Sequence, residues 1–167
     1  PESLPVYTSG WGAKNWEFEP GEAFWSKIME ITGQGSMADV MDAAMEGKSA
    51  PRVWLILHEP DQPELSAVAA LALARELGKR DQATLVLDCD DQCQSLTRWA
   101  ERLEREGWID LARYGTSVMT SSVAMPFSGR RGYLLGVGSF APTDATPIEI
   151  QQLISRLRRQ GDDLILV

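Results

Sequence analysis

The sequence predicts an α/β fold, a three-layer sandwich in which a mainly parallel sheet lies between two layers of helices. Continuous apolar runs, which are typical of strands buried on both faces, recur along the chain from residue 52 onward. Amphipathic segments of helical length alternate with these runs, as in the right-handed crossovers that join parallel strands. In such a sheet a functional site lies outside the carboxyl ends of the strands.

The first two expected strands are 52–57 and 83–90, and their apolar character predicts burial on both faces. Helices are expected to follow them at about 62–79 and at 94–107, where apolar and charged residues are interleaved at helical spacing.

The remaining segments continue this alternation. Residues 108–114 fit a short strand, and 115–125 fit a short helix or loop. A further strand is expected at 133–139, and the closing run 162–167 is expected to be a strand as well.

Two helices carry clear start signals. Ser36 is placed as the N-cap of a helix over 37–47, which Gly47 is expected to end. Thr146 begins a strongly amphipathic helix, with Glu149 three residues on as in a capping box.

Residues 1–19 are rich in proline, glycine and aromatics without a clear period, so we expect an irregular arm before a single domain over 20–167. The start of that domain, 21–31, has its apolar residues on one helical face. Aromatic residues are favoured at protein interfaces, so those in and beside the arm predict a subunit contact and a homo-oligomer. The candidate interface residues are Trp11, Trp16, Phe24 and Trp25.

The composition excludes several classes of function. A formal net charge of -8 over 167 residues disfavours sequence-independent binding to nucleic acid, because an acidic surface repels phosphate. No apolar stretch approaches the roughly 20 residues of a spanning helix, and no signal-peptide pattern is present. We therefore expect a cytoplasmic protein.

The cysteines give no reason to expect a metal centre. Cys89 and Cys93 have no histidine close by in sequence, since His58 is the one histidine of the chain. A buried or half-buried free thiol is the expected state of these residues.

The segment after the first strand, 58–66, has the strand–loop–helix order of a phosphate-binding loop. Such a loop aims backbone N–H groups and a helix N-terminus at an anion, and it uses glycine for close approach and lysine for charge. Here there is neither a glycine nor a lysine, and Pro60 and Pro63 each remove one N–H group.

Carboxylates occupy the place of the phosphate in this loop. Glu59, Asp61 and Glu64 bring like charge to the helix N-terminus, and the Asp61–Glu64 spacing predicts a capping box. We therefore expect an ordinary capped helix and no bound ATP or magnesium.

Four segments, 21–28, 52–80, 83–92 and 133–167, occur in the order found in a known family. With them the chain from about 20 to 167 resembles the ParA/MinD-type P-loop ATPases. It resembles most closely the cytoplasmic tyrosine-kinase domains of bacterial exopolysaccharide synthesis and export.

The resemblance implies roles for individual positions. Leu65 stands where the phosphate-binding lysine would be, and Ser66 where the magnesium-binding hydroxyl would be. Asp88 and Asp90 match the two aspartates of the second acidic motif, although Gln92 replaces the usual arginine. The degenerate nucleotide-site positions are thus Glu64, Leu65, Ser66, Asp88 and Asp90.

What the resemblance implies is a non-catalytic pseudo-ATPase or pseudokinase without cofactor or metal. Its partners would be proteins of a polysaccharide synthesis and export complex, which would hold it at the inner membrane. Two alternatives stay open: an active MinD/ParA-like ATPase switch with an unusual phosphate loop, and a small-molecule enzyme that uses His58 and Asp88.

Overall fold

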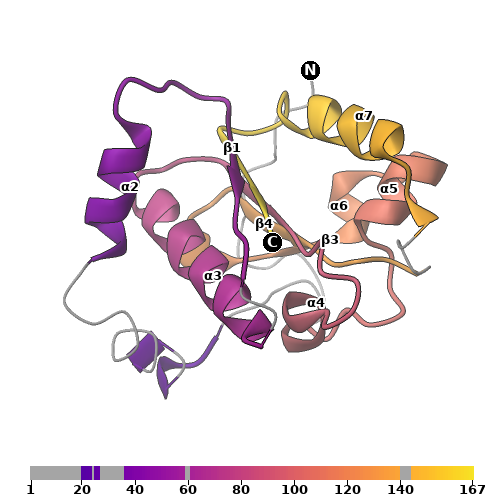
Figure 1. Cartoon of the computed structure of the whole chain (residues 1–167), viewed down its shortest axis with the longest axis horizontal. Helices are drawn as coiled ribbons and strands as arrows, with labels where there is room; N and C mark the ends of the chain where they lie inside the picture. The colour runs from indigo at the N-terminus through magenta and orange to yellow at the C-terminus, as the bar shows by residue number, and fades with distance from the viewer. Residues whose placement is uncertain (1–19, 24, 27–35, 59–60, 140–143) are drawn as a thin grey trace.

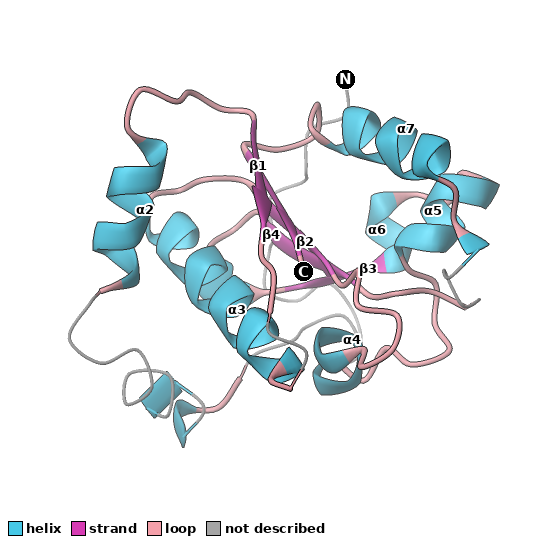
Figure 2. Ribbon diagram, viewed as in Figure 1, coloured by secondary structure: helices cyan, strands magenta, loops and turns pink. Residues whose placement is uncertain are grey.

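The computed structural model describes residues 20–23, 25–26, 36–58, 61–139 and 144–167. These residues form a five-stranded sheet in the order β1-β5-β2-β4-β3, with every neighbouring pair parallel except β3–β4. Figures 1 and 2 show the strands stacked through the middle of the molecule. The strands are β1 (Arg52–Leu55), β2 (Thr84–Leu87), β3 (Ser122–Ala124), β4 (Gly132–Leu135) and β5 (Asp163–Leu166).

Helices cover both faces of this sheet, so the predicted three-layer α/β architecture is confirmed (Figure 1). On one face lie α2 (Met37–Met45), α3 (Pro63–Lys79), the short α4 (Ser95–Trp99) and the 3-10 turn η2 (Pro126–Ser128). On the other face lie α5 (Trp108–Tyr114), α6 (Val118–Ser121) and α7 (Pro147–Leu157).

Each face has its own apolar core, because successive strand residues point to opposite sides of the sheet. Val86, Leu134 and Ile165 pack beneath α3, whereas Leu85 and Leu164 pack beneath α5 and α7. The central strands β2, β4 and β5 are buried along their whole length, as their apolar runs predict.

The predicted N-caps of two helices are confirmed. Ser36 Oγ accepts a hydrogen bond of 3.1 Å from Asp39 N at the start of α2. At α7, Thr146 Oγ1 accepts from Glu149 N at 3.3 Å, and Glu149 Oε2 accepts from Thr146 N at 2.7 Å. Gly47 follows α2 with φ of +69°, a conformation that glycine adopts without strain.

The prediction that the first strand is buried on both faces is wrong. β1 is an edge strand whose residues alternate between half-buried and exposed. Its apolar run reflects two different environments: Trp54 packs on the α3 core, while Val53 and Leu55 remain 41% and 66% exposed.

The region 94–125 departs most from the sequence prediction. The helix expected at 94–107 ends at Trp99, since Glu101 and Glu104 take positive φ values of 54° and 59°. Residues 108–114 form helix α5 rather than a strand. The segment 115–125 holds a short helix, as one of the two expectations had it, but also the antiparallel strand β3.

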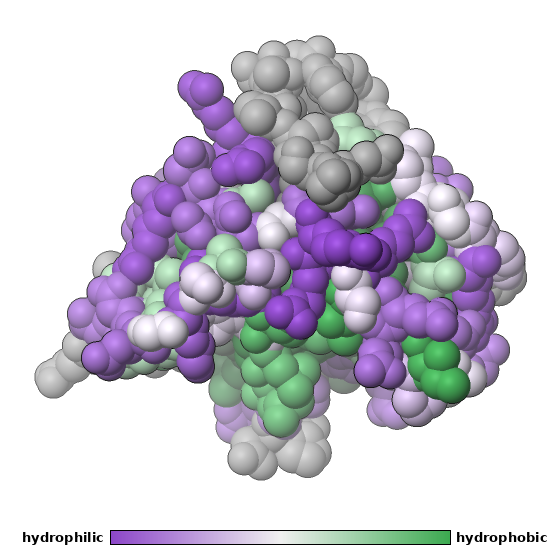
Figure 3. Space-filling model, turned by 90° about the horizontal axis from the view of Figure 1, so that it is seen from above, coloured by the Kyte–Doolittle hydropathy of each residue, from purple (hydrophilic) through white to green (hydrophobic). Residues whose placement is uncertain are grey.

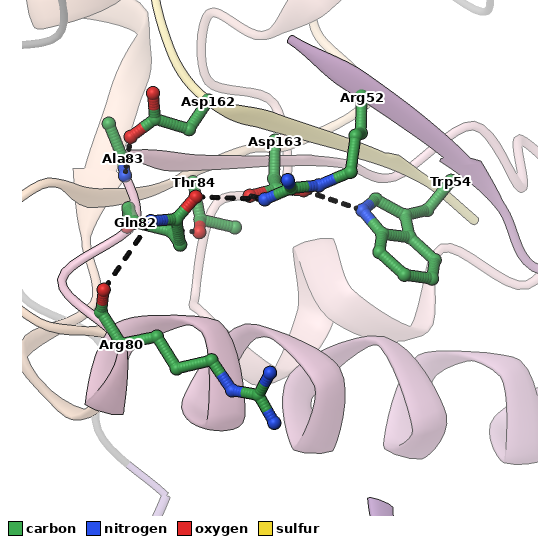
Figure 4. Close-up of polar contacts among 8 residues, drawn as sticks. All are labelled: Arg52, Trp54, Arg80, Gln82, Ala83, Thr84, Asp162 and Asp163. Carbon is green, nitrogen blue, oxygen red and sulfur yellow. Dashed lines mark hydrogen bonds and ion pairs between the residues drawn. The ribbon is translucent and has the colours of Figure 1, made fainter. Parts of the chain in front are cut away.

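A buried ion pair attaches β1 to the rest of the sheet (Figure 4). Arg52 lies opposite Asp163 in the register, and its Nε and Nη2 each donate to a different carboxylate oxygen at 2.7 Å. Trp54 Nε1 donates to the same carboxylate at 2.7 Å, and Arg52 Nη2 also reaches Gln82 Oε1 at 2.8 Å. Hydrogen bonding to Asp163 raises the pKa of Arg52, against the opposing effect of burial.

This cluster generates a prediction about stability. The Asp163 side chain is fully buried, so Asp163→Ala leaves the Arg52 guanidinium and the Trp54 N–H without their acceptor. We expect a loss of about 3–5 kcal/mol in the free energy of unfolding, measured by urea denaturation. Asp163→Asn, which keeps acceptor atoms, is expected to lose less.

Asp144→Ala is the control for this prediction, because the Asp144 side chain is 70% exposed in its ion pair with Arg113. It is expected to change stability little. An equally small effect of Asp163→Ala would mean that the buried pair contributes nothing to the attachment of β1.

Candidate functional site

The carboxyl ends of the parallel strands meet at one edge of the sheet, where the sequence predicts a site. The loop after β1 carries Glu64, Leu65 and Ser66 into the start of α3, and the loop after β2 carries Asp88 and Asp90. Glu59 and Pro60 of the first loop lie outside the described residues.

The N-terminus of α3 differs from the predicted capping box. The helix begins at Pro63, its N-cap is Gln62, and no side chain makes a cap hydrogen bond there. The Asp61–Glu64 capping box is therefore wrong, because the cap falls one residue later than the spacing required. Glu64 still lies in the first turn, where its negative charge interacts favourably with the helix dipole. The same charge would repel an added anion.

The next two positions differ in their exposure. Leu65, at the place of the phosphate lysine, is 42% exposed and brings an apolar side chain to the mouth of the loop. Ser66, at the place of the magnesium hydroxyl, is 2% exposed and thus enclosed by protein.

Asp88 is buried at the end of β2, and its carboxylate is already engaged. Asp88 Oδ2 accepts from Thr97 N at 2.8 Å and from Thr97 Oγ1 at 2.7 Å. Burial raises the pKa of Asp88, while these hydrogen bonds from Thr97 oppose the rise. The carboxylate therefore fixes the start of α4.

Thr97 also connects the ends of two strands. Its Oγ1 donates to Asp88 and accepts from Val137 N at 3.0 Å, beyond the end of β4. A side chain at Gly136 would meet the Thr97 side chain at 3.2 Å, so this crossing is closely packed.

Helix α5 closes the edge between β2 and β4. Trp108 N and Ile109 N donate to Gly136 O and Val137 O at 2.9 and 3.3 Å, so backbone carbonyls from beyond β4 satisfy the first turn. Trp108 Nε1 donates to Asp88 O at 2.8 Å. A Cβ on Gly107 would come within 2.2 Å of Gly136 O, so this approach requires glycine.

Asp110 completes the closure from within the same helix. Its Oδ2 accepts from Gly107 N at 2.9 Å and from Ser139 N at 3.0 Å, and the residue is 4% exposed. The backbone N–H groups of this corner are thus bound by a carboxylate of the chain itself.

The two carboxylate oxygens of Asp90 have different partners, one in a turn and one at His58. Its Oδ1 accepts from Gln92 N and Cys93 N at 3.2 and 3.0 Å, and its Oδ2 lies 3.8 Å from His58 Nε2. This pair can orient the imidazole near the end of β1. Both thiols are free; Cys93 is half-buried as expected, whereas Cys89 is exposed and not buried or half-buried.

The described part of the chain contains no group of three or more His, Cys, Asp or Glu side chains arranged to hold a metal ion. In the same residues, no helix has the length and apolar character needed to cross a membrane.

Of the candidate interface residues, the structure describes Trp25 alone. It is 6% exposed, its ring meets Phe127 edge-on at 5.1 Å, and Arg75 lies 4.4 Å from the ring centroid. A cavity of about 510 Å³ borders this cluster. Trp25 therefore packs within its own chain; Trp11, Trp16 and Phe24 lie outside the described residues.

The mainly parallel five-stranded sheet with helices on both faces is an α/β fold that this chain shares with a solved kinase domain. Among solved structures, the kinase domain of VpsO matches with a TM-score of 0.65 at 19% identity, over 86% of this chain and 70% of that one. The chimerical protein CapA2B2 matches with a TM-score of 0.66 at 15% identity, over 98% of this chain and 70% of that one. No family model matches the sequence, and a search of curated proteins gave no significant match.

Thr97, Trp108 and Asp110 are the residues of this edge that sequence reasoning missed. The Gly107–Asp110 spacing was a signal for a helix start, but the strand expected at 108–114 concealed it. No sequence pattern marks Thr97, whose role depends on the crossing of two loops.

The raised pKa of Asp88 predicts a pH dependence. An acid whose folded pKa exceeds its ordinary value of about 3.9 stabilises the fold fully below that value and loses this stabilisation as the pH rises through the raised pKa. Relative to Asp88→Asn, wild type should therefore lose stability as the pH rises above about 4, measured by urea denaturation at a series of pH values.

Asp61→Asn, at an exposed position, serves as the control for this titration. Parallel stability curves for wild type and Asp88→Asn would show that Asp88 does not titrate differently in the folded and unfolded states.

The packing of Trp25 leads to a second prediction. Trp25→Ala should lower the free energy of unfolding by about 3–5 kcal/mol, since it removes a large buried side chain. Denaturation measures the loss, and light scattering measures the oligomer size, which is expected to stay that of wild type. A smaller oligomer with unchanged stability would instead assign Trp25 to a subunit interface.

Proposed function

We propose that this chain is a non-catalytic, P-loop-like domain that acts through protein contacts in bacterial exopolysaccharide synthesis and export. The supporting observation is the occupation of the carboxyl edge by the protein's own groups. Asp88 is bound to Thr97, and α5 is docked on the residues that follow β4.

The chemistry of the loop after β1 supports the loss of ATP binding. Binding a triphosphate requires cationic and backbone donors, and Leu65 supplies neither a charge nor a hydrogen-bond donor from its side chain. Glu64 adds a negative charge at the helix N-terminus. An incoming phosphate would meet like charge and an apolar side chain.

The pathway is proposed from two similarities. The sequence resembles the tyrosine-kinase domains of exopolysaccharide synthesis and export, and the fold matches that of the VpsO kinase domain. On this proposal the domain is cytoplasmic, self-associates, and lies at the inner membrane through protein partners of the export complex. It binds neither nucleic acid nor a cofactor.

Titration with ATP and magnesium tests the loss of nucleotide binding. We expect no saturable heat in calorimetry and no shift in the melting temperature, at concentrations that saturate an active P-loop ATPase. The physical reason is the absence of a side-chain cation at Leu65 together with the engaged Asp88.

Leu65→Glu and Ile148→Glu form a matched pair for this titration, because both wild-type side chains are exposed and only Leu65 lies in the first turn of α3. Magnesium-dependent ATP binding that Leu65→Glu abolishes and Ile148→Glu preserves would overturn the proposal and make the domain an active switch.

A further inference from the structure

A cavity of about 510 Å³ lies between α3, η2 and the segment that follows Pro20. This volume is in the range of pockets that hold small molecules, about 300–1,000 Å³. Arg75 from α3 and Phe127 from η2 contribute to its wall, together with Glu22 and Trp25. A cation, an anion and two aromatic rings thus meet at one cavity, and this mixture of apolar surface and a few charged groups is typical of a ligand site.

The guanidinium of Arg75 is held in place by an aromatic ring. Its Cζ lies 4.4 Å from the centroid of the Trp25 ring, which is a cation–π contact. Within the described residues, this guanidinium makes no hydrogen bond and no ion pair. The ring therefore orients the guanidinium while its N–H groups remain available to a ligand.

The walls on either side of Arg75 are fixed to each other. Ser128 Oγ donates to Ala74 O in a buried hydrogen bond of 2.7 Å. A Cβ on Gly78 would come within 2.3 Å of the Ser128 backbone, so α3 and η2 approach as closely as glycine allows. Phe127, the neighbour of Ser128, contacts the Trp25 ring edge-on. The cavity is thus formed without a ligand, which lowers the entropic cost of binding one.

The charges around the cavity favour a ligand with a single negative charge. Arg75 is the one cation among the lining residues, and Glu22 adds a negative charge. The whole chain has a net charge of -8, and hydrophilic residues predominate on the surface seen in Figure 3. A phosphate dianion would be repelled by Glu22 and by the protein as a whole. A carboxylate needs one guanidinium, which binds it through two parallel hydrogen bonds.

We propose that this cavity binds a small monocarboxylate with an aromatic body. The carboxylate pairs with Arg75, and the aromatic body packs against the half-buried ring of Phe127. Glu22, which is exposed, disfavours ligands with a second negative charge. The ligand is a free small molecule, because a cavity of this volume encloses one.

This inference goes beyond the proposed function and does not depend on it. Arg75 follows Leu65 along α3 by about 15 Å, so the cavity is separate from the loop after β1. Titrations with ATP and with a carboxylate therefore report on different sites, and either proposal can fail without the other.

The first experiment is a calorimetric titration of the whole chain with phenylacetate. Phenethylamine is the matched ligand without a carboxylate. Phenylacetate should bind saturably, and phenethylamine should not. Arg75→Gln should weaken phenylacetate binding at least about tenfold, because it removes a charge-assisted pair of hydrogen bonds.

Arg158→Gln is the matched control, since Arg158 is an exposed arginine outside the cavity. This variant should bind phenylacetate as wild type does. Circular dichroism melts check that both variants fold. Arg75→Lys, which keeps the charge but cannot form the two parallel hydrogen bonds, should bind with intermediate affinity.

The second experiment tests the role of charge with Glu22→Gln, a change at an exposed position. This variant should bind phenylacetate at least as tightly as wild type. It should also bind phenyl phosphate, which wild type should reject because of the negative charge of Glu22. Equal affinity of wild type for phenylacetate and phenyl phosphate would overturn the assignment to a monocarboxylate.

Two further results would overturn the proposal. One is the absence of saturable phenylacetate binding to wild type at about 10 mM, a concentration at which weak ligands of this size bind. The other is phenylacetate binding that Arg75→Gln leaves unchanged, which would place the ligand outside this cavity.

Discussion

The paired hydrogen bonds between Arg52 and Asp163 are the constraint on which the edge of this fold depends. β1 has one neighbouring strand and leaves half of its side chains in contact with solvent, so burial alone holds it weakly. A desolvated ion pair helps only when its remaining donors and acceptors are satisfied. Here Trp54 and Gln82 complete that set, and the pair fixes the position of β1 against β5.

At the carboxyl ends of the central strands, side chains of the protein also satisfy the backbone groups of the loops, in the region where ligands bind in open α/β sheets. The side chains of Asp88, Thr97 and Asp110 accept hydrogen bonds from backbone N–H groups of these loops. Trp108 Nε1 donates to the backbone carbonyl of Asp88. A carboxylate engaged in this way would have to break protein contacts before it could bind a metal or a nucleophile. These contacts hold the loops at the carboxyl ends of β2 and β4 in place.

The sequence predicts the layers, the central strands and the capped helices, because periodicity and caps are local properties. It does not distinguish β1 from a buried strand, because the apolar run of β1 resembles those of the central strands although its alternate side chains are exposed. The early end of α4 depends on left-handed backbone conformations at Glu101 and Glu104. Glutamate rarely adopts this conformation, so the sequence does not predict it. Order along the chain puts Ser66 at the start of α3 and Asp88 after β2, but their burial and the contacts of Thr97 arise from loops that cross in space.

The order of the strands also constrains how the domain is made. β5 lies between β1 and β2 although it follows the other four described strands in the sequence, and its ion pair with Arg52 joins residues 111 positions apart. During synthesis β1 and β2 therefore emerge with a gap between them that nothing local can fill. The apolar sides of that gap stay open until β5 has been synthesised, so the pairing of β1 with the rest of the sheet is a late step in folding.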